Sequence, residues 1–349
     1  MSDFASRLIA WQKQHGRHDL PWQNTRDPYA IWVSEIMLQQ TQVAAVIGYY
    51  AKFMQRFPDI AALANATQEE VLQYWSGLGY YSRARNLHNA AAIILDDHEG
   101  AFPQDFNTIQ TLPGIGRSTA AAIVSFAFNQ AQTILDGNVK RVLARHHVVE
   151  GWPSTPKIEK ELWLLAECLL PNQDVIAYTQ GLMDLGATLC TRSKPKCAVC
   201  PLISTCKAYE QKRVHALPTR KLRQVIPEKY TTMLILRCGD EVMLEKRPPK
   251  GIWGGLWSFP QADESQVEQL LSQLFGVSAA VDQSLPTRIH TFTHFKLHIQ
   301  PQVFRVEKLD NICHSGQIWL GLEDAIGAAI PTPVRKVLQT LQKTPSGKS

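Results

Sequence analysis

Four cysteines fall within seventeen residues in the stretch LCTRSKPKCAVCPLISTC, residues 189–206. The four positions, Cys190, Cys197, Cys200 and Cys206, follow a C-x6-C-x2-C-x5-C pattern. Such a spacing is typical of a metal or cluster site, because thiolates can hold either a structural zinc ion or a cubane iron-sulfur cluster. One close pair flanked by two single cysteines favours the cluster over zinc. The chain must therefore fold so that this loop closes around one group.

The N-terminal residues and the apolar runs of the sequence indicate in which compartment these thiols lie. The first residues, MSDFASRLIAWQKQ, lack the features of a secretory signal, and no apolar run is long enough to span a membrane. We therefore expect a cytoplasmic protein with reduced thiols and no membrane contact. The remaining cysteines, Cys168, Cys238 and Cys313, are expected to be buried as small hydrophobic residues.

Positive charge gathers at the same loop. Arg192, Lys194 and Lys196 lie between the first two clustered cysteines, and residues 190–229 hold ten Lys or Arg against two Glu, although the whole chain is only +5. Such a segment suits a phosphate backbone, although basic runs are also common in solvated linkers. A ligated loop would fix where the charges point, which favours nucleic acid.

The chain is long enough for two domains, at 349 residues. Residues 1–213 show an almost entirely helical pattern, with a helix expected from Pro28, capped by Asp27, to about Tyr50. Thr67 and Glu70 form a capping box. Further helices are expected near residues 83–95, 117–128, 138–147 and 157–169.

Composition changes after the clustered cysteines. Residues 214–229 are interpreted as a basic linker, and residues 230–343 combine strand and helix patterns. TTMLILR and EVMLEKR are expected to pair as strands, and residues 344–349 are expected to be disordered. The fold class is therefore multidomain, with an all-α domain followed by an α+β domain.

A glycine-containing turn precedes one of the expected helices. In LPGIGRSTA, residues 112–120, the backbone at Gly114 and Gly116 can approach a phosphate, and the start of the following helix offers free N–H groups. The same pattern also occurs in simple helix connectors, so both interpretations stay open.

Two carboxylates are candidates for acid–base chemistry. Glu35 lies on an apolar helix face with Ile31 and Leu38, where burial would resist ionisation, although a structural glutamate is the common alternative. Asp136 precedes a helix, where capping would keep its pKa low. One protonated and one ionised carboxylate is the combination used in glycosidic chemistry.

Taken together, the motifs resemble a known family. SEIMLQQTQV, GLGYYSRARNL, LPGIGRSTA, ILDGNVKRVLAR and the four-cysteine loop resemble the helix-hairpin-helix DNA glycosylases, and closely the MutY-type adenine DNA glycosylases. The resemblance covers nearly the whole chain. It implies removal of adenine opposite 8-oxoguanine or guanine in duplex DNA during base excision repair, by a protein that we expect to be monomeric.

The resemblance also implies roles for individual residues. Glu35 protonates adenine at N7, Asp136 stabilises the cationic sugar, and Asn138 assists. Ser118 replaces the lysine that related lyases use to attack the sugar, which implies a monofunctional enzyme. The cysteines would hold a [4Fe-4S] cluster. Contacts with the DNA are implied for Gln40, Thr41, Tyr80, Gly114, Gly116, Ser118, Arg192, Lys194 and Lys196.

The second domain resembles the Nudix-like domain with which this family senses 8-oxoguanine. Phe292, Thr293 and His294 match its Phe-Ser-His loop, with threonine in place of serine. Glu264 and Glu268 are present, but the paired glutamates that a metal-dependent pyrophosphatase needs beside them are missing, so we do not expect pyrophosphate hydrolysis.

Three alternatives stay open at this point. They are an endonuclease III-like lyase, which would need the lysine that Ser118 replaces; a Nudix hydrolase, which would need the metal carboxylates; and a non-enzymatic iron-sulfur DNA-binding protein, which would leave Glu35 without a role.

Overall fold

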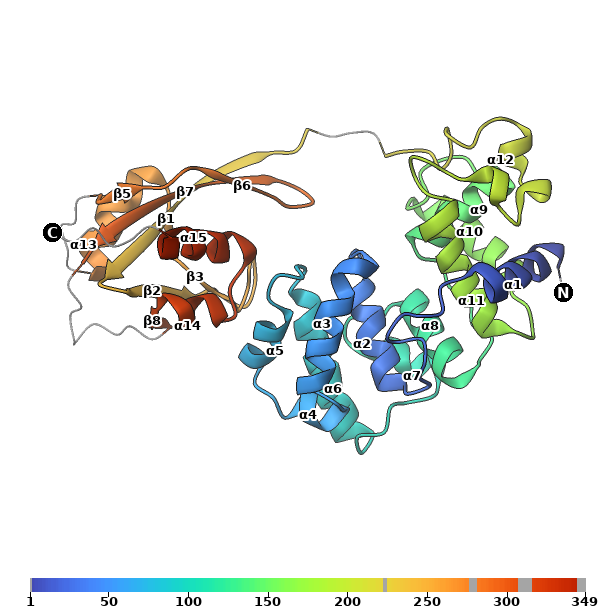
Figure 1. Cartoon of the computed structure of the whole chain (residues 1–349), viewed down its shortest axis with the longest axis horizontal. Coiled ribbons are helices and arrows are strands. Elements are labelled where there is room, and N and C mark those ends of the chain that lie inside the picture. Colours follow the sequence, from blue (N-terminus) through green and yellow to red (C-terminus); the bar gives the residue numbers. More distant parts are fainter. Residues whose placement is uncertain (1, 222–224, 276–280, 307–315, 344–349) are drawn as a thin grey trace. The chain divides into compact units, whose positions relative to one another are not determined.

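The computed structural model describes residues 2–221, 225–275, 281–306 and 316–343 (Figure 1). The expected disordered tail and Cys313 lie outside the described residues. The chain forms two compact units: residues 1–65 with 86–223, and residues 66–85 with 224–349. Within the described residues, no helix has both the length and the apolar character needed to cross a membrane.

The first unit is helical, as the sequence predicts. Its elements are α1 (Asp3–His15), α2 (Pro28–Leu38), α3 (Val43–Arg56), α4 (Ile60–Ala64), α6 (Ser82–Asp97, which begins in the second unit), α7 (Phe106–Thr111), α8 (Arg117–Phe128), α9 (Gly137–His147), α10 (Pro156–Leu169), α11 (Val175–Asp184) and α12 (Lys207–Glu210), with a π-helical turn η1 (Leu185–Leu189) and 3₁₀ turns η2 (Cys197–Val199) and η3 (Ile203–Thr205). The four helices expected after residue 80 correspond to α6, α8, α9 and α10.

The prediction of a single helix from Pro28 to Tyr50 is wrong, because the helix is interrupted between α2 and α3. Asp27 caps α2 as expected, accepting a hydrogen bond from Tyr29 N at 3.0 Å. Gln40 adopts a left-handed conformation with φ 57°, which an α-helix cannot contain. The break leaves Gln40 exposed in a turn.

The hydrophobic core of the first unit packs its first helix, α1, against the later helices α9, α10 and α11. Leu8 of α1, Leu143 of α9, Leu162 of α10 and Leu182 of α11 are buried in one hydrophobic cluster. Each of these side chains contributes about 1.5–3 kcal/mol when it leaves water. Cys168, on α10, is exposed, so the prediction that it is buried is wrong. Its helix presents only Leu162 and Ala166 as buried residues.

The second unit is built on one mixed sheet. Its strands are β1 (Glu228–Cys238), β2 (Glu241–Lys246), β3 (Trp257–Ser258), β4 (Gln261–Ala262), β5 (Gln283–Ser284), β6 (Arg288–Thr291), β7 (Lys296–Arg305) and β8 (Gln317–Gly321). Its helices are α5 (Gln68–Trp75), α13 (Val267–Phe275), α14 (Leu322–Gly327) and α15 (Thr332–Lys343), with a 3₁₀ turn η4 (Glu264–Gln266).

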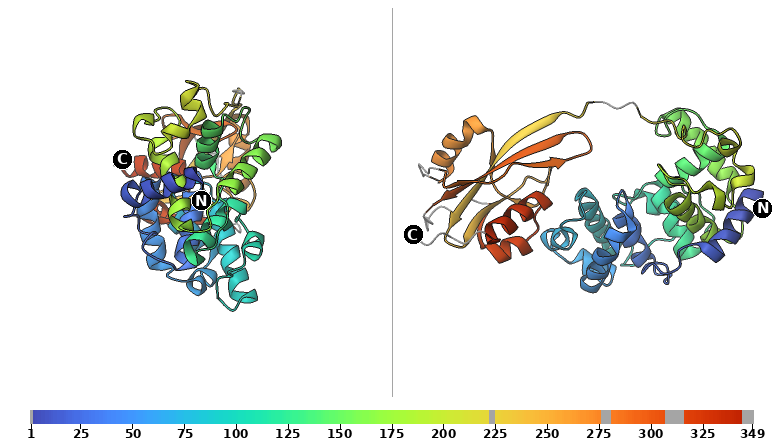
Figure 2. Two further views of the ribbon diagram at one scale, coloured as in Figure 1. Left: turned by 90° about the vertical axis from the view of Figure 1, so that its right-hand side faces the viewer. Right: turned by 45° about the horizontal axis from the view of Figure 1, so that its top comes forward.

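Strand β1 is the centre of this sheet, in the order β3-β2-β1-β7-β5. It pairs with β2 in the antiparallel hairpin that the sequence predicts, and with β7 in parallel. Residues 233–236 of β1 are fully buried, as a central strand requires. Helices α14 and α15, drawn in red, lie beside the strands (Figure 2).

Residues 66–85 pack against the sheet domain within this unit. Thr67 caps α5 as predicted, accepting from Glu70 N at 3.2 Å. Lys246 forms an ion pair with Glu69 at 2.6 Å, and Arg335 donates to Ser76 Oγ at 2.9 Å. The segment that follows the capping box is thereby held beside the second domain.

Candidate active site and nucleic-acid interface

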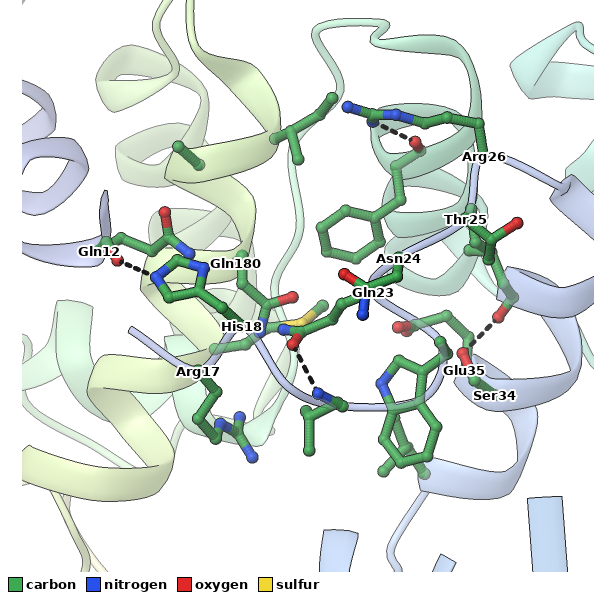
Figure 3. A pocket seen from close by; sticks show the side chains of 18 of the residues that line it. Gln12, Arg17, His18, Gln23, Asn24, Thr25, Arg26, Ser34, Glu35 and Gln180 are labelled. Atoms are coloured by element: carbon green, nitrogen blue, oxygen red, sulfur yellow. Dashed lines mark hydrogen bonds between the residues drawn. The ribbon is translucent and has the colours of Figure 1, made fainter. Parts of the chain in front are cut away.

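A pocket of about 480 Å³ opens in the first unit beside α2 and α11 (Figure 3). Glu35 lines it together with Ile31 and Leu38, so the helix face that the sequence analysis singled out is confirmed. Polar side chains, among them His18, Gln23 and Gln180, line the pocket together with apolar ones such as Trp22 and Phe126. A hollow of this size suits a flat heterocycle, since small-molecule sites begin at about 300 Å³.

Glu35 is the acid of this pocket. Burial, together with the nearby charge of Asp136, raises its pKa to about 8. The carboxyl group therefore holds its proton at neutral pH while facing a hollow. This is the state that a general acid needs, and it agrees with the expectation from the sequence.

Asp136 caps α9. Its carboxylate accepts from Val139 N at 2.8 Å and from Asn138 Nδ2 at 3.2 Å. The expectation of a low pKa is wrong: burial raises the pKa of Asp136, and the hydrogen bonds from Val139 and Asn138 oppose that shift only in part. Asp136 is not among the residues that line the pocket, and its effect on Glu35 is electrostatic.

Ser118 supports the segment before Asp136. Its hydroxyl oxygen accepts a hydrogen bond from the backbone N–H of Leu135 at 2.9 Å. Because Leu135 immediately precedes Asp136, this hydrogen bond fixes the position of the backbone that carries the Asp136 side chain. The side chain offers no amine.

Arg141 connects Asn138 with the cysteine loop, and the sequence analysis did not single it out. Its Nη2 donates to Asn138 Oδ1 at 2.8 Å and to Gly186 O at 2.7 Å, while its Nε donates to Cys190 O at 2.7 Å. The sequence signal was a cation four residues after the start of α9, on the same helix face as that start.

Arg145, one turn further along α9, organises the cysteine loop. It is 2% exposed and donates to the carbonyls of Cys190, Thr191 and Arg192 and to Cys190 Sγ, the last at 3.3 Å. Its Nε donates to Leu217 O at 2.9 Å. A buried guanidinium with this many carbonyl partners holds the loop in one conformation.

The four clustered cysteines line one apolar cavity with Val142, Leu185 and Leu202. Burial and the neighbouring thiols raise the pKa of Cys200 to about 11, and they raise the pKa values of Cys197 and Cys206 as well. Four thiols around one cavity, which His146 also lines, fit a group that binds thiolates. Within the described ranges, no three His, Cys, Asp or Glu side chains are placed to hold a single metal ion.

The cations of this loop face solvent. Arg192, Lys194 and Lys196 are exposed, and the loop backbone beneath them is bound to Arg145. Val214 and Leu217, within the segment interpreted as a linker, pack with Ala208 in a small core. The basic side chains therefore project from a fixed loop.

The turn between α7 and α8 is also exposed. Gly114 has φ 81°, and a Cβ there would lie 2.9 Å from Asn86 Cβ, so no other residue fits. Gly116 is the N-cap of α8 and is exposed, which leaves the backbone N–H groups of the first turn open. Gln39 donates to Gly114 O at 3.4 Å and to Thr119 Oγ1 at 3.3 Å, and this brings the turn containing Gln40 and Thr41 beside the glycines.

A second pocket, of about 540 Å³, lies within the second unit. Tyr80 lines it with Phe292, Thr293 and His294, so the structure brings these four candidate residues together at one pocket. Tyr80 is 45% exposed and has φ 49°. Gly77 and Gly79, both with positive φ, form the turn that precedes it.

Aromatic packing shapes this second pocket. Phe292 stacks on Phe295 with ring centroids 4.6 Å apart, and its N–H donates to Phe295 O at 2.9 Å, which closes the hairpin between β6 and β7. Trp253 and His290 also contact the Phe292 ring, with ring centroids 5.9 Å and 4.6 Å away. Glu264 and Glu268 are both exposed.

Comparison with known proteins locates both domains. Residues 33–168 match the HhH-GPD superfamily of base excision DNA repair proteins, and residues 231–340 match the NUDIX domain. The chain is 37% identical to an adenine DNA glycosylase of Buchnera aphidicola, covering 97% of this chain and 98% of that protein. It is 34% identical to the adenine DNA glycosylase of Homo sapiens, over 97% of this chain and 74% of that protein. A thermostable thymine-DNA glycosylase of known structure has a TM-score of 0.55 and 32% identity, covering 60% of this chain and 95% of that one.

Proposed function

Because the chain belongs to the family of adenine DNA glycosylases, with an HhH-GPD domain and a C-terminal Nudix domain, we propose that it removes adenine mispaired with 8-oxoguanine or guanine in duplex DNA. The reaction is hydrolysis of the N-glycosidic bond, as a step of base excision repair. The proposal depends above all on Glu35, an acid that keeps its proton at neutral pH while lining a pocket of base-like size.

The reaction begins with the adenine outside the duplex. Extruding the base costs a few kcal/mol, and the pocket beside Glu35 receives it. Glu35 gives its proton to N7, and adenine leaves with the electron pair of the glycosidic bond. Proton donation by a placed acid contributes about 10²–10⁴ in rate.

Asp136 stabilises the cation that remains on the sugar. Its carboxylate is held by Val139 N and Asn138 Nδ2, and Asn138 is in turn held by Arg141. Water then adds its oxygen to C1′, and the proton that water loses restores the acid at Glu35. The product is an abasic site.

The absence of an amine at Ser118 supports a monofunctional reaction. A lyase needs an amine to form a Schiff base with the sugar, whereas the Ser118 hydroxyl accepts from Leu135 N. We therefore propose that the DNA strand stays intact until the abasic site is cleaved by alkali.

Cys190, Cys197, Cys200 and Cys206 would hold a [4Fe-4S] cluster, which supplies a rigid thiolate-bound core for the loop when bound. Arg145 holds the loop backbone, so Arg192, Lys194 and Lys196 are presented at fixed positions. We propose that these cations, the open N–H groups at Gly116 and the Gln40–Thr41 turn bind the DNA backbone.

The second pocket provides a site for the base opposite adenine. Phe292 offers an aromatic face, and Thr293 and His294 offer hydrogen-bonding groups beside it. Tyr80 lines the same pocket and is exposed enough to enter the base stack. We propose that 8-oxoguanine is recognised here.

The decisive experiment is single-turnover release of adenine from a duplex with adenine opposite 8-oxoguanine. We expect Glu35→Gln to lower the rate by about 10²–10⁴ while DNA binding is retained. Glu161→Gln, an exposed change of the same chemistry on α10, serves as the matched control and should release adenine at the wild-type rate. Strand breaks should appear only after alkali.

Absence of adenine release by the wild-type protein would refute the proposal. Breaks without alkali would instead indicate a lyase, and duplex binding without release would indicate a DNA-binding protein.

A further inference from the structure

The segment of residues 77–81, here called the Tyr80 turn, lies between two residues that are bound to the sheet domain. Ser76, at the end of α5, is 8% exposed, and its hydroxyl group contacts the second domain. Arg85, in the first turns of α6, donates from Nη1 to Gly254 O at 2.8 Å. The Tyr80 turn is therefore anchored on both sides, while the Tyr80 side chain itself is 45% exposed.

Arg335 of α15 is the cation that binds Ser76. Its Nη2 donates to Ser76 Oγ at 2.9 Å, and its Nη1 donates to Ile326 O of α14 at 2.5 Å. The Ser76 hydroxyl in turn donates to Ile330 O at 2.5 Å. The guanidinium is planar, and its donors form a rigid fork, so two simultaneous bonds fix Ser76 relative to α14.

Contacts within the segment carry the position of Ser76 to Tyr80. Trp75, which precedes Ser76 and is fully buried, donates from Nε1 to Gly79 O at 3.2 Å. Arg83 Nη2 donates to the same carbonyl at 3.2 Å, and its guanidinium lies 5.4 Å from the centroid of the Tyr80 ring. A displacement of Ser76 would therefore move the peptide that immediately precedes Tyr80.

We infer that Arg335 is a positioning residue for Tyr80: by holding Ser76, it keeps the Tyr80 turn in the geometry with which the ring enters the base stack. This inference rests on the proposed glycosylase function. Tyr80 shares its pocket with residues 292–294, and both belong to one compact unit. Arg335 is not among the residues that line this pocket, so it acts through Ser76 and not by contact with a base.

The test is a double-mutant cycle on single-turnover release of adenine opposite 8-oxoguanine. It compares the wild type, Arg335→Met, Tyr80→Ala and the double variant. Methionine keeps an apolar stem and removes both hydrogen bonds of the guanidinium. We expect Arg335→Met to slow release about tenfold when Tyr80 is present and at most about twofold in Tyr80→Ala, because no ring is then left to position.

Dependence on Tyr80 separates positioning from a general loss of stability, which would slow release equally with and without the ring. Lys343→Met is the matched control, since it removes an exposed cation from the last turn of the same helix. It should release adenine within about twofold of the wild-type rate. Arg335→Lys keeps a donor at this position and should recover part of the lost rate.

Ser76→Ala covers the case in which Arg335→Met does not fold. It removes the hydroxyl group that accepts from Arg335 and leaves the guanidinium bound to Ile326 O. The slowing of adenine release should again require Tyr80.

Equal slowing in the presence and absence of the Tyr80 ring, or no slowing in either variant, would overturn the inference. Release at the wild-type rate by Tyr80→Ala would overturn it as well, because the turn would then have no ring to place. Absence of adenine release by the wild-type protein would instead overturn the proposed function, so the two failures are distinguishable.

Discussion

The two pockets of this molecule differ in the chemistry that surrounds them. The pocket in the first unit contains Glu35, whose proton is retained because burial and Asp136 disfavour its charge. The pocket in the second unit contains no carboxylate among its lining residues and is shaped by stacked aromatic rings. The first arrangement suits bond cleavage and the second suits recognition of a base by shape and stacking. The comparison teaches that the protonated acid and the aromatic pocket occur in separate parts of the chain, as the proposed division between bond cleavage and base recognition requires.

The largest expected effect concerns the charge of Asp136. Asparagine is an equally good N-cap, so Asp136→Asn keeps the start of α9 and removes only the negative charge. We expect adenine release to fall by about 10²–10³, because an electrostatic partner of the developing cation is lost. Single-turnover assays and thermal midpoints check this. A large fall in the midpoint would mean that the role of Asp136 is structural.

The next prediction uses the pKa of Glu35. Adenine release should fall as pH rises through about 8, the pKa of the acid, and Asp136→Asn should move this limb to lower pH because a negative neighbour is removed. A pH–rate profile of the single-turnover step measures both effects. A flat profile between pH 7 and about 9 would contradict the assignment of the acid.

The raised pKa of Glu35 also predicts how the stability of the protein changes with pH. The pKa of Glu35 is raised from 4.5 to about 8 on folding, so the folded state binds more protons than the unfolded state within that window. Stability should therefore decrease as pH rises from about 4.5 to about 8. Glu35→Gln should show a smaller decrease in thermal midpoint over this range. Equal slopes for the two proteins would show that Glu35 is not protonated.

A smaller effect is expected in the second pocket. Phe292→Ala removes the stacking face, which is worth about 1–3 kcal/mol per base, and should reduce the preference for 8-oxoguanine over guanine by about tenfold. The pH limb of adenine release should not move, since Phe292 carries no charge. Thr293→Ser is the conservative control and should keep the preference. A shift of the pH limb would show that the second pocket affects the pKa of the acid in the first pocket.

The smallest effect concerns Ser118. Ser118→Ala leaves the Leu135 N–H without its acceptor, at a cost of about 1–3 kcal/mol in the free energy of unfolding. Adenine release should fall only modestly, since no reacting group is lost. Urea unfolding and single-turnover release check the two parts. A loss of release as large as that of Asp136→Asn would give Ser118 a direct role.

Local features were the part that the sequence predicted well. The caps at Asp27 and Thr67 and the α9 start at Asp136 follow from side chains that satisfy N–H groups within three residues. The helix expected from Pro28 to Tyr50 failed because nothing local in the sequence marks the left-handed residue Gln40. The pKa of Asp136 was misjudged because capping is local, whereas burial depends on the whole fold.

The sequence by itself determined the two kinds of domain, the family, the cysteine pattern and the apolar face around Glu35, since these depend on residue types and short spacings. Only the tertiary structure decided which distant groups meet. It brought Asp184 to Arg17, Arg141 to Cys190, and Tyr80 to the Phe292 loop. The physical reason is that hydrogen bonds and charge effects act over a few ångströms, and packing, which no spacing along the chain encodes, sets those distances.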